Sequence, residues 1–420
     1  MNNLFCSRVW PSTLAVFLVL LLISPSRAET WPRFRGPNGS GVGTAKSMPT
    51  SWTKDDYLWR VELPGSGYSS PVVWNDRVYV TSGDEKEGTQ IVQAFDTKTG
   101  ELVWEQPFKA DPYKKHRLNS YATSTPVLDA EKIYVTWGGP KGSTVVALDR
   151  ATGDEKWRYE MGPYVAMHNF AASPMLVDDV VVVLNDQDKH RMLVALDRAT
   201  GEVKWKSEED SEADATYSTP CIFQPPGAAA QLIVGRTLAG LSSLDPRTGK
   251  ENWNLDLSFK YRLIGSPIML NDRLVVTCGS GGGGLGVAVV QAGVPENNVE
   301  PTILYNVKKD LPYVPTPLLH DGLLYLWSDS AKVKCIELDS GKELWKGRLR
   351  GKFYSSPVLV DGKLYGISDK GKVFVLAAGQ EFKELGKVDL GEKTMATPAV
   401  ADGVMYLRTL THLMALPGKS

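Results

Sequence analysis

The residues in this sequence that are best suited to chemistry precede a series of Ser-Pro and Thr-Pro dipeptides. They combine aromatic rings with an imidazole, an amide and a guanidinium: Tyr68, Tyr121, His168, Asn169, Tyr217, Arg262, Tyr313 and Tyr354. Such a set could form a ligand site, because aromatic faces supply contact area and a few polar groups fix orientation. The same rings could instead plug a channel and hydrogen-bond to one another. His168 could act as a base or donor near neutral pH, although a lone histidine is more often a satisfied loop residue.

Two other motifs resemble binding sites but lack the residues that would complete them. The stretch "GSGGGGLG" at 279–286 contains Gly-x-Gly-x-x-Gly, but strand-like residues follow it where a phosphate-binding motif requires a helix. We expect a loop between the second and third strands of a repeat. Asp186 and Asp188 could hold calcium, yet no glycine turn or distal Glu accompanies them, which favours a solvated hairpin tip. The five histidines show no zinc-site spacing, so we nominate no catalytic residue and no metal ligand.

The stretch "WPRFRGPNGSGVG" at 31–43 carries two arginines between aromatic residues. Arg33 and Arg35 could bind an anion. The alternative reading, which we favour, is that Trp31 and Phe34 pin an extended segment across one face of the fold.

The elements that must position these residues form repeats. Each Ser/Thr-Pro opens an alternating run, then a polar turn and a strand rich in Val or Tyr, as in "SSPVLVDGKLYGI". The prolines that open the repeats lie 40 to 55 residues apart: Pro71, Pro126, Pro174, Pro220, Pro267, Pro317, Pro357 and Pro398. Alternation with period two and dense turn signals predict strands, with little room for helix. The sequence therefore predicts eight units of four strands each.

A second phrase recurs in the outer half of the repeats. "LDRATGDEKW" at 148–157 returns as "LDRATGEVKW" at 196–205. The Asp can accept hydrogen bonds from main-chain N–H groups two residues on, and the Gly permits a tight turn, so each phrase predicts a β-hairpin. A tryptophan buries about 150–250 Å², so we expect it to wedge between neighbouring units. The expected docking tryptophans are Trp59, Trp104, Trp157, Trp205, Trp253 and Trp345.

Four-stranded units with a period near 45 residues predict an eight-bladed β-propeller. The last repeat lacks a fourth strand, while "YLWRVELPG" at 57–65 precedes the first repeat. We therefore expect this N-terminal strand to complete the last blade and close the ring. Blades five and seven lack the tryptophan and should have weak joints. The expected organisation is an extended segment at 29–56 and the propeller at 57–420.

The N-terminus predicts export. Residues 14–23 form an unbroken apolar run, and Ser26-Arg27-Ala28 follows with small residues at a cleavage site. We expect a signal peptide at 1–28, a mature protein in the periplasm or outside the cell, and no stable membrane insertion after cleavage. Retention of the apolar run as an anchor is the alternative.

Composition limits the classes of partner. The chain has 47 Lys and Arg against 48 Asp and Glu, without a basic block, which argues against nucleic acid. Cys221, Cys278 and Cys335 stand in apolar, strand-like contexts, so we expect buried thiols rather than a disulfide framework. We also expect a monomeric propeller.

The Ser/Thr-Pro openings and the Asp-x-x-Thr-Gly-x-x-x-Trp phrases resemble the pyrroloquinoline-quinone (PQQ) repeat family of eight-bladed propellers. The resemblance covers nearly the whole mature chain. One branch of that family contains dehydrogenases that use PQQ and calcium in the central funnel. Another contains non-catalytic propellers, among them the propeller subunit of the outer-membrane β-barrel assembly machine. The motif identifies the fold and carries no information on activity.

Departures from the enzyme branch decide the expected function. No two cysteines are adjacent, there is no Cys-x-x-Cys-His haem site, and the chain is hardly longer than eight bare blades. We therefore expect a non-catalytic scaffold of the cell envelope, without a cofactor, that binds a protein or an extracellular polymer. The alternative is an alcohol or sugar dehydrogenase dependent on PQQ and calcium.

Overall fold

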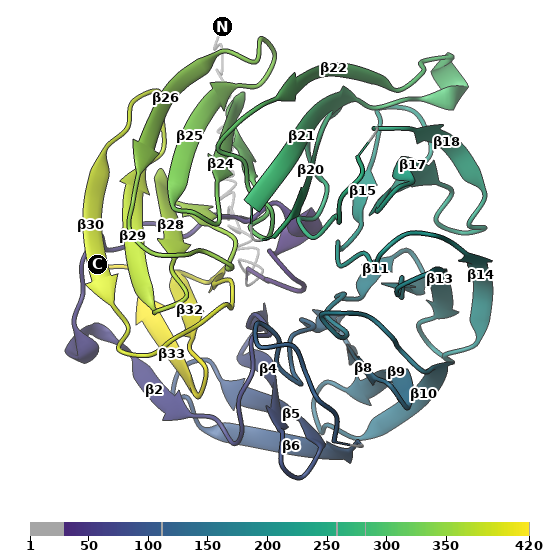
Figure 1. Cartoon of the computed structure of the whole chain (residues 1–420). Coiled ribbons are helices and arrows are strands. Elements are labelled where there is room, and N and C mark those ends of the chain that lie inside the picture. The colour runs from purple at the N-terminus through teal and green to yellow at the C-terminus, as the bar shows by residue number, and fades with distance from the viewer. Residues whose placement is uncertain (1–28, 111, 258, 282, 420) are drawn as a thin grey trace, which may run out of the picture.

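The computed structural model describes residues 29–110, 112–257, 259–281 and 283–419, and these form a ring of eight blades (Figure 1). Each blade is an antiparallel sheet of four strands, and one sheet has a fifth strand. The prediction of an eight-bladed, all-β propeller is confirmed. The expected signal peptide at 1–28 lies outside the described residues.

The blades follow the sequence in order. The strands of blades one to four are β3 (Val72–Trp74), β4 (Arg77–Asp84), β5 (Thr89–Asp96), β6 (Leu102–Lys109), β7 (Val127–Leu128), β8 (Lys132–Gly139), β9 (Gly142–Asp149), β10 (Glu155–Gly162), β11 (Met175–Val177), β12 (Val180–Leu184), β13 (His190–Asp197), β14 (Val203–Asp210), β15 (Cys221–Phe223), β16 (Gln231–Arg236), β17 (Gly240–Leu244) and β18 (Glu251–Leu255). The strands of blades five to eight are β19 (Ile268–Leu270), β20 (Arg273–Ser280), β21 (Gly283–Gln291), β22 (Thr302–Val307), β23 (Leu318–His320), β24 (Leu323–Trp327), β25 (Lys332–Glu337), β26 (Glu343–Arg348), β27 (Val358–Val360), β28 (Lys363–Ile367), β29 (Lys372–Ala377), β30 (Glu384–Asp389), β31 (Ala399–Ala401), β32 (Val404–Arg408), β33 (His412–Pro417) and, from the N-terminal region, β2 (Trp59–Glu62).

Short elements complete the described chain. They are β1 (Val42–Gly43) and the 3₁₀ helices η1 (Pro37–Gly39), η2 (Lys54–Asp56) and η3 (Pro295–Asn297). None of the helices in the described part of the chain has the length and hydropathy that crossing a bilayer would require.

The N-terminal strand closes the ring as the sequence predicted. β2 pairs antiparallel with β33, with Trp59 opposite Ala415 and Glu62 opposite His412. The last blade thus takes its outer strand from the start of the chain and its other three from the end. This arrangement ties strands from the two ends of the described chain into one sheet, and Trp59 of β2 then donates to Thr97 O of blade one at 2.9 Å.

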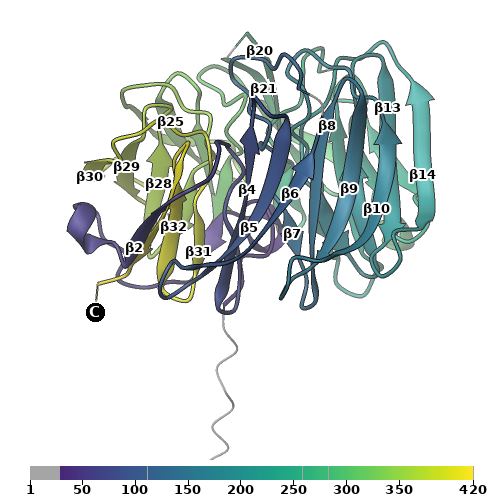
Figure 2. The ribbon, with the colours of Figure 1, turned by 90° about the horizontal axis from the view of Figure 1, so that it is seen from below.

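The two faces of the ring differ in their connections. One face carries the links from each blade to the next and the hairpins between second and third strands; we call it the open face. It faces the viewer in Figure 1 and points upward in Figure 2, where β20 and β21 rise above the other blades. The Thr-Gly turns of the tryptophan phrases lie on the opposite face.

The Ser/Thr-Pro dipeptides build a ring of hydrogen bonds around the axis. Before seven of the eight repeat prolines, the main-chain N–H of the preceding residue donates to the side-chain hydroxyl of the equivalent residue in the next blade. For example, Ser70 N–H donates to Thr125 Oγ1 at 2.9 Å, and Thr397 N–H donates to Ser70 Oγ at 3.1 Å. Seven such contacts join described residues around the ring. The repeat therefore needs a hydroxyl at this position because it links neighbouring blades.

The tryptophans lie at the joints between blades. The indole N–H of each donates to a main-chain carbonyl of the next blade, as Trp157 does to Arg198 at 3.1 Å. The turn that faces the tryptophan requires a glycine for two reasons. Gly201 has a positive φ of 78°, and a Cβ at this position would lie 2.6 Å from the Trp157 ring. The tryptophans that make this type of bond are Trp59, Trp104, Trp157, Trp205, Trp253 and Trp345.

Other groups occupy the joints of blades five and seven, where the tryptophan is missing, and the weakness expected of these joints stays a prediction. In blade five, Tyr305 takes the tryptophan position and its hydroxyl donates to Leu338 O at 2.5 Å. In blade seven, the N-terminal segment supplies the contacts: Tyr365 donates to Pro49 O at 2.9 Å, and Trp52 is buried in the same apolar cluster. A chain segment distant in sequence thus replaces the missing side chain.

The segment with the two arginines crosses the axis beneath the ring of hydroxyls, and Figure 1 shows it in purple at the centre. Arg35 is fully buried, and its guanidinium donates to Pro357 O at 2.8 Å and Pro317 O at 2.7 Å. Arg33 donates to Pro220 O at 2.8 Å. Neither arginine pairs with an acidic residue in the described chain. The segment therefore closes the channel from one side, and its arginines bind carbonyl groups of this chain rather than an external anion.

The three cysteines of the described chain are free and buried, as expected. Burial raises the pKa of the Cys221, Cys278 and Cys335 thiols to about 12. These thiols are therefore packing groups rather than nucleophiles.

Candidate functional site

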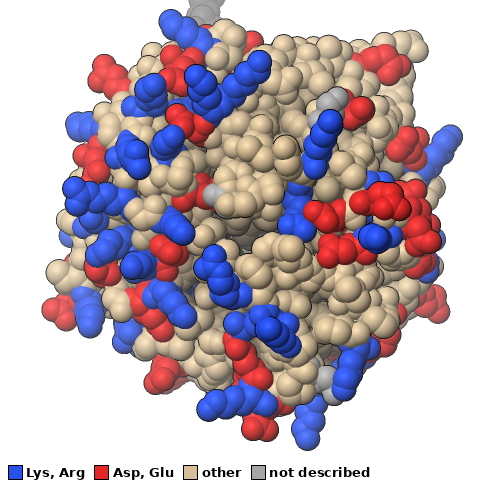
Figure 3. All heavy atoms as spheres, viewed as in Figure 1, with Lys and Arg blue, Asp and Glu red and all other residues tan. Residues whose placement is uncertain are grey.

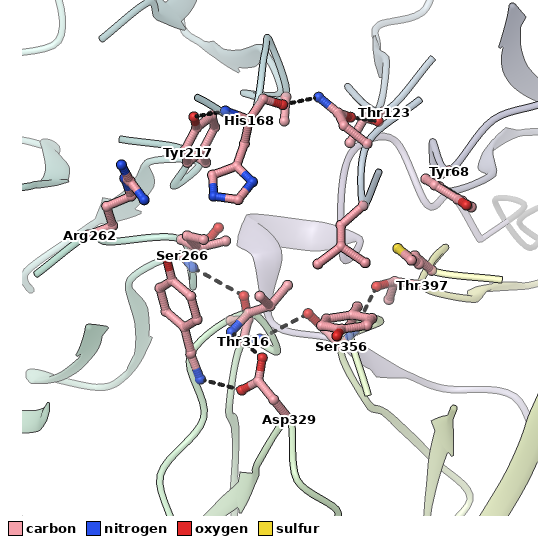
Figure 4. Close-up of a pocket in the computed structure, with 18 of the residues that line it drawn as sticks. Tyr68, Thr123, His168, Tyr217, Arg262, Ser266, Thr316, Asp329, Ser356 and Thr397 are labelled. Atoms are coloured by element: carbon pink, nitrogen blue, oxygen red, sulfur yellow. Dashed lines mark hydrogen bonds between the residues drawn. The ribbon is translucent and has the colours of Figure 1, made fainter. Parts of the chain in front are cut away.

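A cavity of about 660 Å³ occupies the centre of the open face. Its base is formed by the ring of hydroxyls and by Phe34 of the N-terminal segment. Figure 3 shows the hollow from outside, and Figure 4 shows the side chains that project into it. The aromatic residues therefore surround an open funnel and do not plug it. The funnel is closed at its base by the chain's own N-terminal segment, so a ligand would enter from the open face.

The structure brings together six of the eight residues that the sequence singled out. Those that line the funnel are Tyr68, His168, Tyr217, Arg262, Tyr313 and Tyr354. Burial raises the pKa of each of these four tyrosine hydroxyls, so the phenols stay protonated and serve as donors and acceptors.

The other two residues lie behind the wall. Tyr121 is 5% exposed, stacks on Tyr113 with ring centroids 4.5 Å apart, and donates to Tyr113 O at 2.8 Å. Asn169 accepts a hydrogen bond from His116 N–H at 2.8 Å. Both residues position the connections that carry the funnel residues, but neither lines the funnel itself.

His168 forms a pair with a histidine that the sequence analysis missed. Nδ1 of His168 lies 3.0 Å from Nδ1 of His116. The main-chain N–H of Leu118 also donates to His116 Nδ1, at 3.2 Å. His116 Nδ1 is therefore the unprotonated acceptor, and His168 Nδ1 must carry the proton between the rings. This tautomer leaves Nε2 of His168 as an acceptor.

The surroundings keep both imidazoles neutral. Burial, followed by the nearby His116 and Arg262, lowers the pKa of His168 to about 4. Burial, Arg117 and Lys115 lower the pKa of His116 as well. At neutral pH the pair is uncharged, so it offers hydrogen-bonding groups rather than a positive charge.

Arg262 supplies the positive charge on the same wall. Its guanidinium forms an ion pair with Asp214 at 3.0 Å and contacts Met167 Sδ at 3.8 Å. Its Nε is buried and has no hydrogen-bond partner among the described residues. Because Arg262 lines the funnel, its guanidinium can offer an N–H donor to a ligand that enters there.

Asp329 faces His168 across the funnel (Figure 4) and was also missed. Its carboxylate accepts main-chain N–H groups of Tyr313 at 2.7 Å and Val314 at 3.2 Å. Burial outweighs these bonds and raises its pKa to about 6. Among the described residues that line the funnel, it is the only acid.

Sequence signals for both missed residues exist in retrospect. The interval from Pro71 to Pro126 is the longest between repeats, and His116 lies in the extra length. Asp329 follows a second strand rather than preceding a Ser/Thr-Pro. The same Ser-Asp-x-x-Lys pattern begins at Ser328 and again at Ser368, in blades six and seven.

Asp186 and Asp188 are not the solvated hairpin tip that the sequence favoured. Asp186 is 2% exposed and lies 3.3 Å from Arg236, and burial raises its pKa. Asp188 accepts main-chain N–H groups of Met167 and Ala215, which anchors two funnel connections. The glycine-rich stretch at 279–286 does join the second and third strands of blade five, but it is mostly not the predicted loop, because it includes the end of β20 and the start of β21.

Exposed apolar side chains lie on one part of the open face, and one of them, Met167, also lines the funnel. Five of them lie on the open face, on connections and hairpins of blades two to five, and are between 46% and 61% exposed: Val165, Met167, Leu238, Tyr261 and Leu285. We call this set the apolar rim. Exposed apolar groups concentrated near a cavity mark interaction sites more often than scattered ones. The rim and funnel together can bind a ligand with apolar surface and a few polar groups.

Comparisons with known proteins agree with this architecture. A family model described as outer membrane protein assembly factor BamB matches residues 51–114, 88–305 and 306–381. No curated protein sequence matches the chain. The solved structure of BamB from Moraxella catarrhalis is similar, with a TM-score of 0.60 at 14% identity over 86% of this chain and 96% of that one.

Enzymes share the fold as well. A europium-containing methanol dehydrogenase has a TM-score of 0.66 at 13% identity, over 91% of this chain and 90% of that one. The quinohemoprotein alcohol dehydrogenase from Comamonas testosteroni has a TM-score of 0.66 at 14% identity, over 93% and 81%. At such identities these likenesses concern the fold alone. Because the family model matches most of the chain, the protein belongs to the PQQ-repeat family described as outer membrane protein assembly factor BamB.

Proposed function

We propose that this protein is a non-catalytic scaffold of the cell envelope, exported by its N-terminal signal, whose open face binds another protein or a polymer. The observation that carries the proposal is the apolar rim around a funnel that the chain itself closes at the base. Exposed apolar side chains surrounded by polar ones are typical of docking surfaces. The family match to an assembly factor supports the same reading.

Site-specific crosslinking in the producing cells tests this function. A photo-crosslinking amino acid at Met167 or Leu238 should give discrete adducts, because both side chains project from the open face. Leu102 and Val203, exposed on the outer strands β6 and β14, are matched control positions and should give none. Equal labelling from both sets of positions would contradict the proposal.

A dehydrogenase using PQQ and calcium is the second candidate. Arg117, Arg262 and Lys352 line the funnel between aromatic rings, and such a set suits an anionic aromatic quinone. Calcium, however, takes six to eight oxygen ligands, usually with several carboxylates. Asp329 is the only acid among the described lining residues, and both its oxygens already accept main-chain N–H groups. Among the residues that the structure describes, no group of three or more His, Cys, Asp or Glu is arranged to hold a metal. The donor set therefore fits the quinone's charge but not its calcium.

Titration of the mature protein with PQQ, with and without calcium, separates the two candidates. Tryptophan fluorescence and visible absorbance report binding. The scaffold reading expects no saturable binding at micromolar cofactor. Saturable binding that requires calcium would favour the dehydrogenase and would be followed by alcohol and aldose screens.

A further inference from the structure

The open face carries a second surface, which is formed by blades six to eight and meets the funnel at Lys352. Six exposed cations lie on β26 and on the loops that follow it in chain order: Lys346, Arg348, Arg350, Lys352, Lys370 and Lys393. We call them the basic arc. None of them forms an ion pair with any described residue. In Figure 3 many blue side chains lie over this side of the ring, with red ones between them.

The arc is continuous because hydrogen bonds join its loops. Asp369 N–H donates to Lys352 O at 2.8 Å, and Thr394 N–H donates to Asp369 O at 3.2 Å. Leu410 N–H then donates to Lys393 O at 3.0 Å. The loops that carry the charges are thus joined to one another along one side of the open face.

A groove of about 290 Å³ begins the arc on blade six. Its walls include Lys332, Lys346 and Arg348, with Asp310 as the one acid among the described lining residues. At its floor Lys334 is 4% exposed, and its ammonium donates to Lys309 O at 2.8 Å. Asp310 pairs with Lys332, so the positive charge of the groove exceeds the negative charge.

Blade three presents the opposite charge on the same face. Exposed acids follow one another at the end of β14 and in the next connection: Glu208, Glu209, Asp210, Glu212 and Asp214. Figure 3 shows them as the red area across the funnel from the basic arc. A flat anionic surface would meet both regions at once and be repelled by one of them. A narrow chain can follow the arc and avoid the acids.

The composition of the arc argues for a polymer rather than a protein segment. Protein interfaces are enriched in aromatic residues and depleted in lysine, whereas four of the six arc cations are lysines. The exposed apolar side chains of the open face lie on blades two to five instead. We propose that the basic arc binds a linear polyanion, a polysaccharide or similar polymer that bears carboxylate or phosphate groups along its length. Binding of this kind gains from the release of counterions and therefore weakens steeply with salt.

Binding to defined polymers over a range of sodium chloride concentrations tests this proposal. The probes are polygalacturonate, which carries carboxylates, long-chain polyphosphate, and dextran as a neutral control. The mature protein should bind at least one anionic polymer at low salt and should not bind dextran. The variant Lys346→Gln/Arg348→Gln/Arg350→Gln leaves the funnel lining intact. Its affinity for the polymer should be at least about tenfold lower than that of the parent, and its affinity should depend less steeply on salt.

A matched control carries the same charge change on the opposite face: Lys98→Gln/Arg247→Gln/Lys250→Gln. These three residues are exposed and unpaired in the described chain, so this variant should bind as the parent does. Equal loss in both variants, or no binding to either polyanion at low salt, would overturn the proposal. Vesicles containing anionic phospholipid are the final arm: binding that exceeds polymer binding and is lost in the arc variant would assign the arc to a membrane surface instead. Crosslinking at Met167 is independent of these results, so failure here leaves the proposed scaffold function untouched.

Discussion

The joints between blades use nearly the same residues in every repeat, whereas the wall of the funnel uses different residues in different repeats. At six joints the same atom of the same residue type, the indole nitrogen of tryptophan, donates to a carbonyl of the next blade. Around the funnel the hydroxyls also repeat, but the residues just above them differ from blade to blade, as with Tyr68, His168 and Arg262. Closing a ring requires nearly equal angles between blades, which accounts for the recurrence of one residue type at six of the eight joints. Closure places no such demand on the rim, which is therefore free to carry binding groups.

The largest expected effect comes from breaking the joint that closes the ring. Deleting residues 57–65 removes β2, its pairing with β33, and Trp59. We expect a loss of more than about 5 kcal/mol in the free energy of unfolding, since a buried tryptophan alone is worth about 3–5 kcal/mol. Thermal and denaturant unfolding measure it. An unchanged melting temperature would contradict closure by this strand.

Individual joints come next. Trp157→Ala and Trp205→Ala should each lower the free energy of unfolding by about 3–5 kcal/mol, because each leaves a cavity and an unpaired carbonyl. Denaturant titrations provide the measurement. Val203→Ala is the matched control on the same strand as Trp205 and, since Val203 is 45% exposed, should change stability little. Losses below about 1 kcal/mol at both tryptophans would refute their docking role.

The N-terminal segment at the base of the funnel should depend on the Arg35 side chain for its stability. Arg35→Met leaves Pro317 O and Pro357 O buried without donors, which we expect to cost about 2–4 kcal/mol. Arg60→Met, at an exposed arginine on β2, serves as the control in the same unfolding experiment. If the two variants were equally stable, the N-terminal segment would not be held by its arginine.

The joint of blade five offers a finer test. Tyr305→Phe keeps the ring and removes only the hydroxyl that donates to Leu338 O, so we expect a loss of about 1 kcal/mol. Tyr261→Phe, at an exposed tyrosine, should have no measurable effect on unfolding. A loss of unfolding free energy as large as that of Trp157→Ala would contradict the expectation that this single hydrogen bond contributes less than a whole docking tryptophan.

The smallest expected effect concerns the funnel wall and pH. The folded-state pKa of His168 is about 4, below its ordinary value of 6.5. Between these values the unfolded chain binds more protons, so acidification from pH 6.5 to 4 destabilises the folded protein. His168→Gln should therefore lose less stability than the parent over this range. Partial exposure of His168 to the funnel keeps the difference small.

The titration of Asp329 changes stability with pH in the opposite direction to that of His168, so Asp329 must be present in both the parent and the His168→Gln variant. Its folded-state pKa of about 6 exceeds the ordinary 3.8, so the folded protein binds more protons between these values and gains stability as pH falls. Because this contribution is common to parent and variant, it cancels in the comparison of their unfolding curves. Parallel curves for the two proteins would mean that His168 titrates normally.

The sequence by itself determined the number of blades, the strand pattern, the closing strand and the positions of the tryptophans. These follow from short-range signals, because alternation of period two and Asp-x-x-Thr-Gly turns specify hairpins whose partners are close in sequence. The sequence also predicted six of the residues that line the funnel, because each precedes an inner strand and inner strands must converge on the axis.

Only the tertiary structure decided which groups meet across long separations. Arg35 reaches carbonyls of residues 317 and 357, Pro49 bonds with Tyr365, and His116 pairs with His168. No local periodicity encodes such contacts, because they depend on how far the ring turns before it closes. The basic arc follows this rule only in part: four of its six charges lie within residues 346–352, whereas Lys370 and Lys393 join them because neighbouring loops are hydrogen-bonded to each other around the axis.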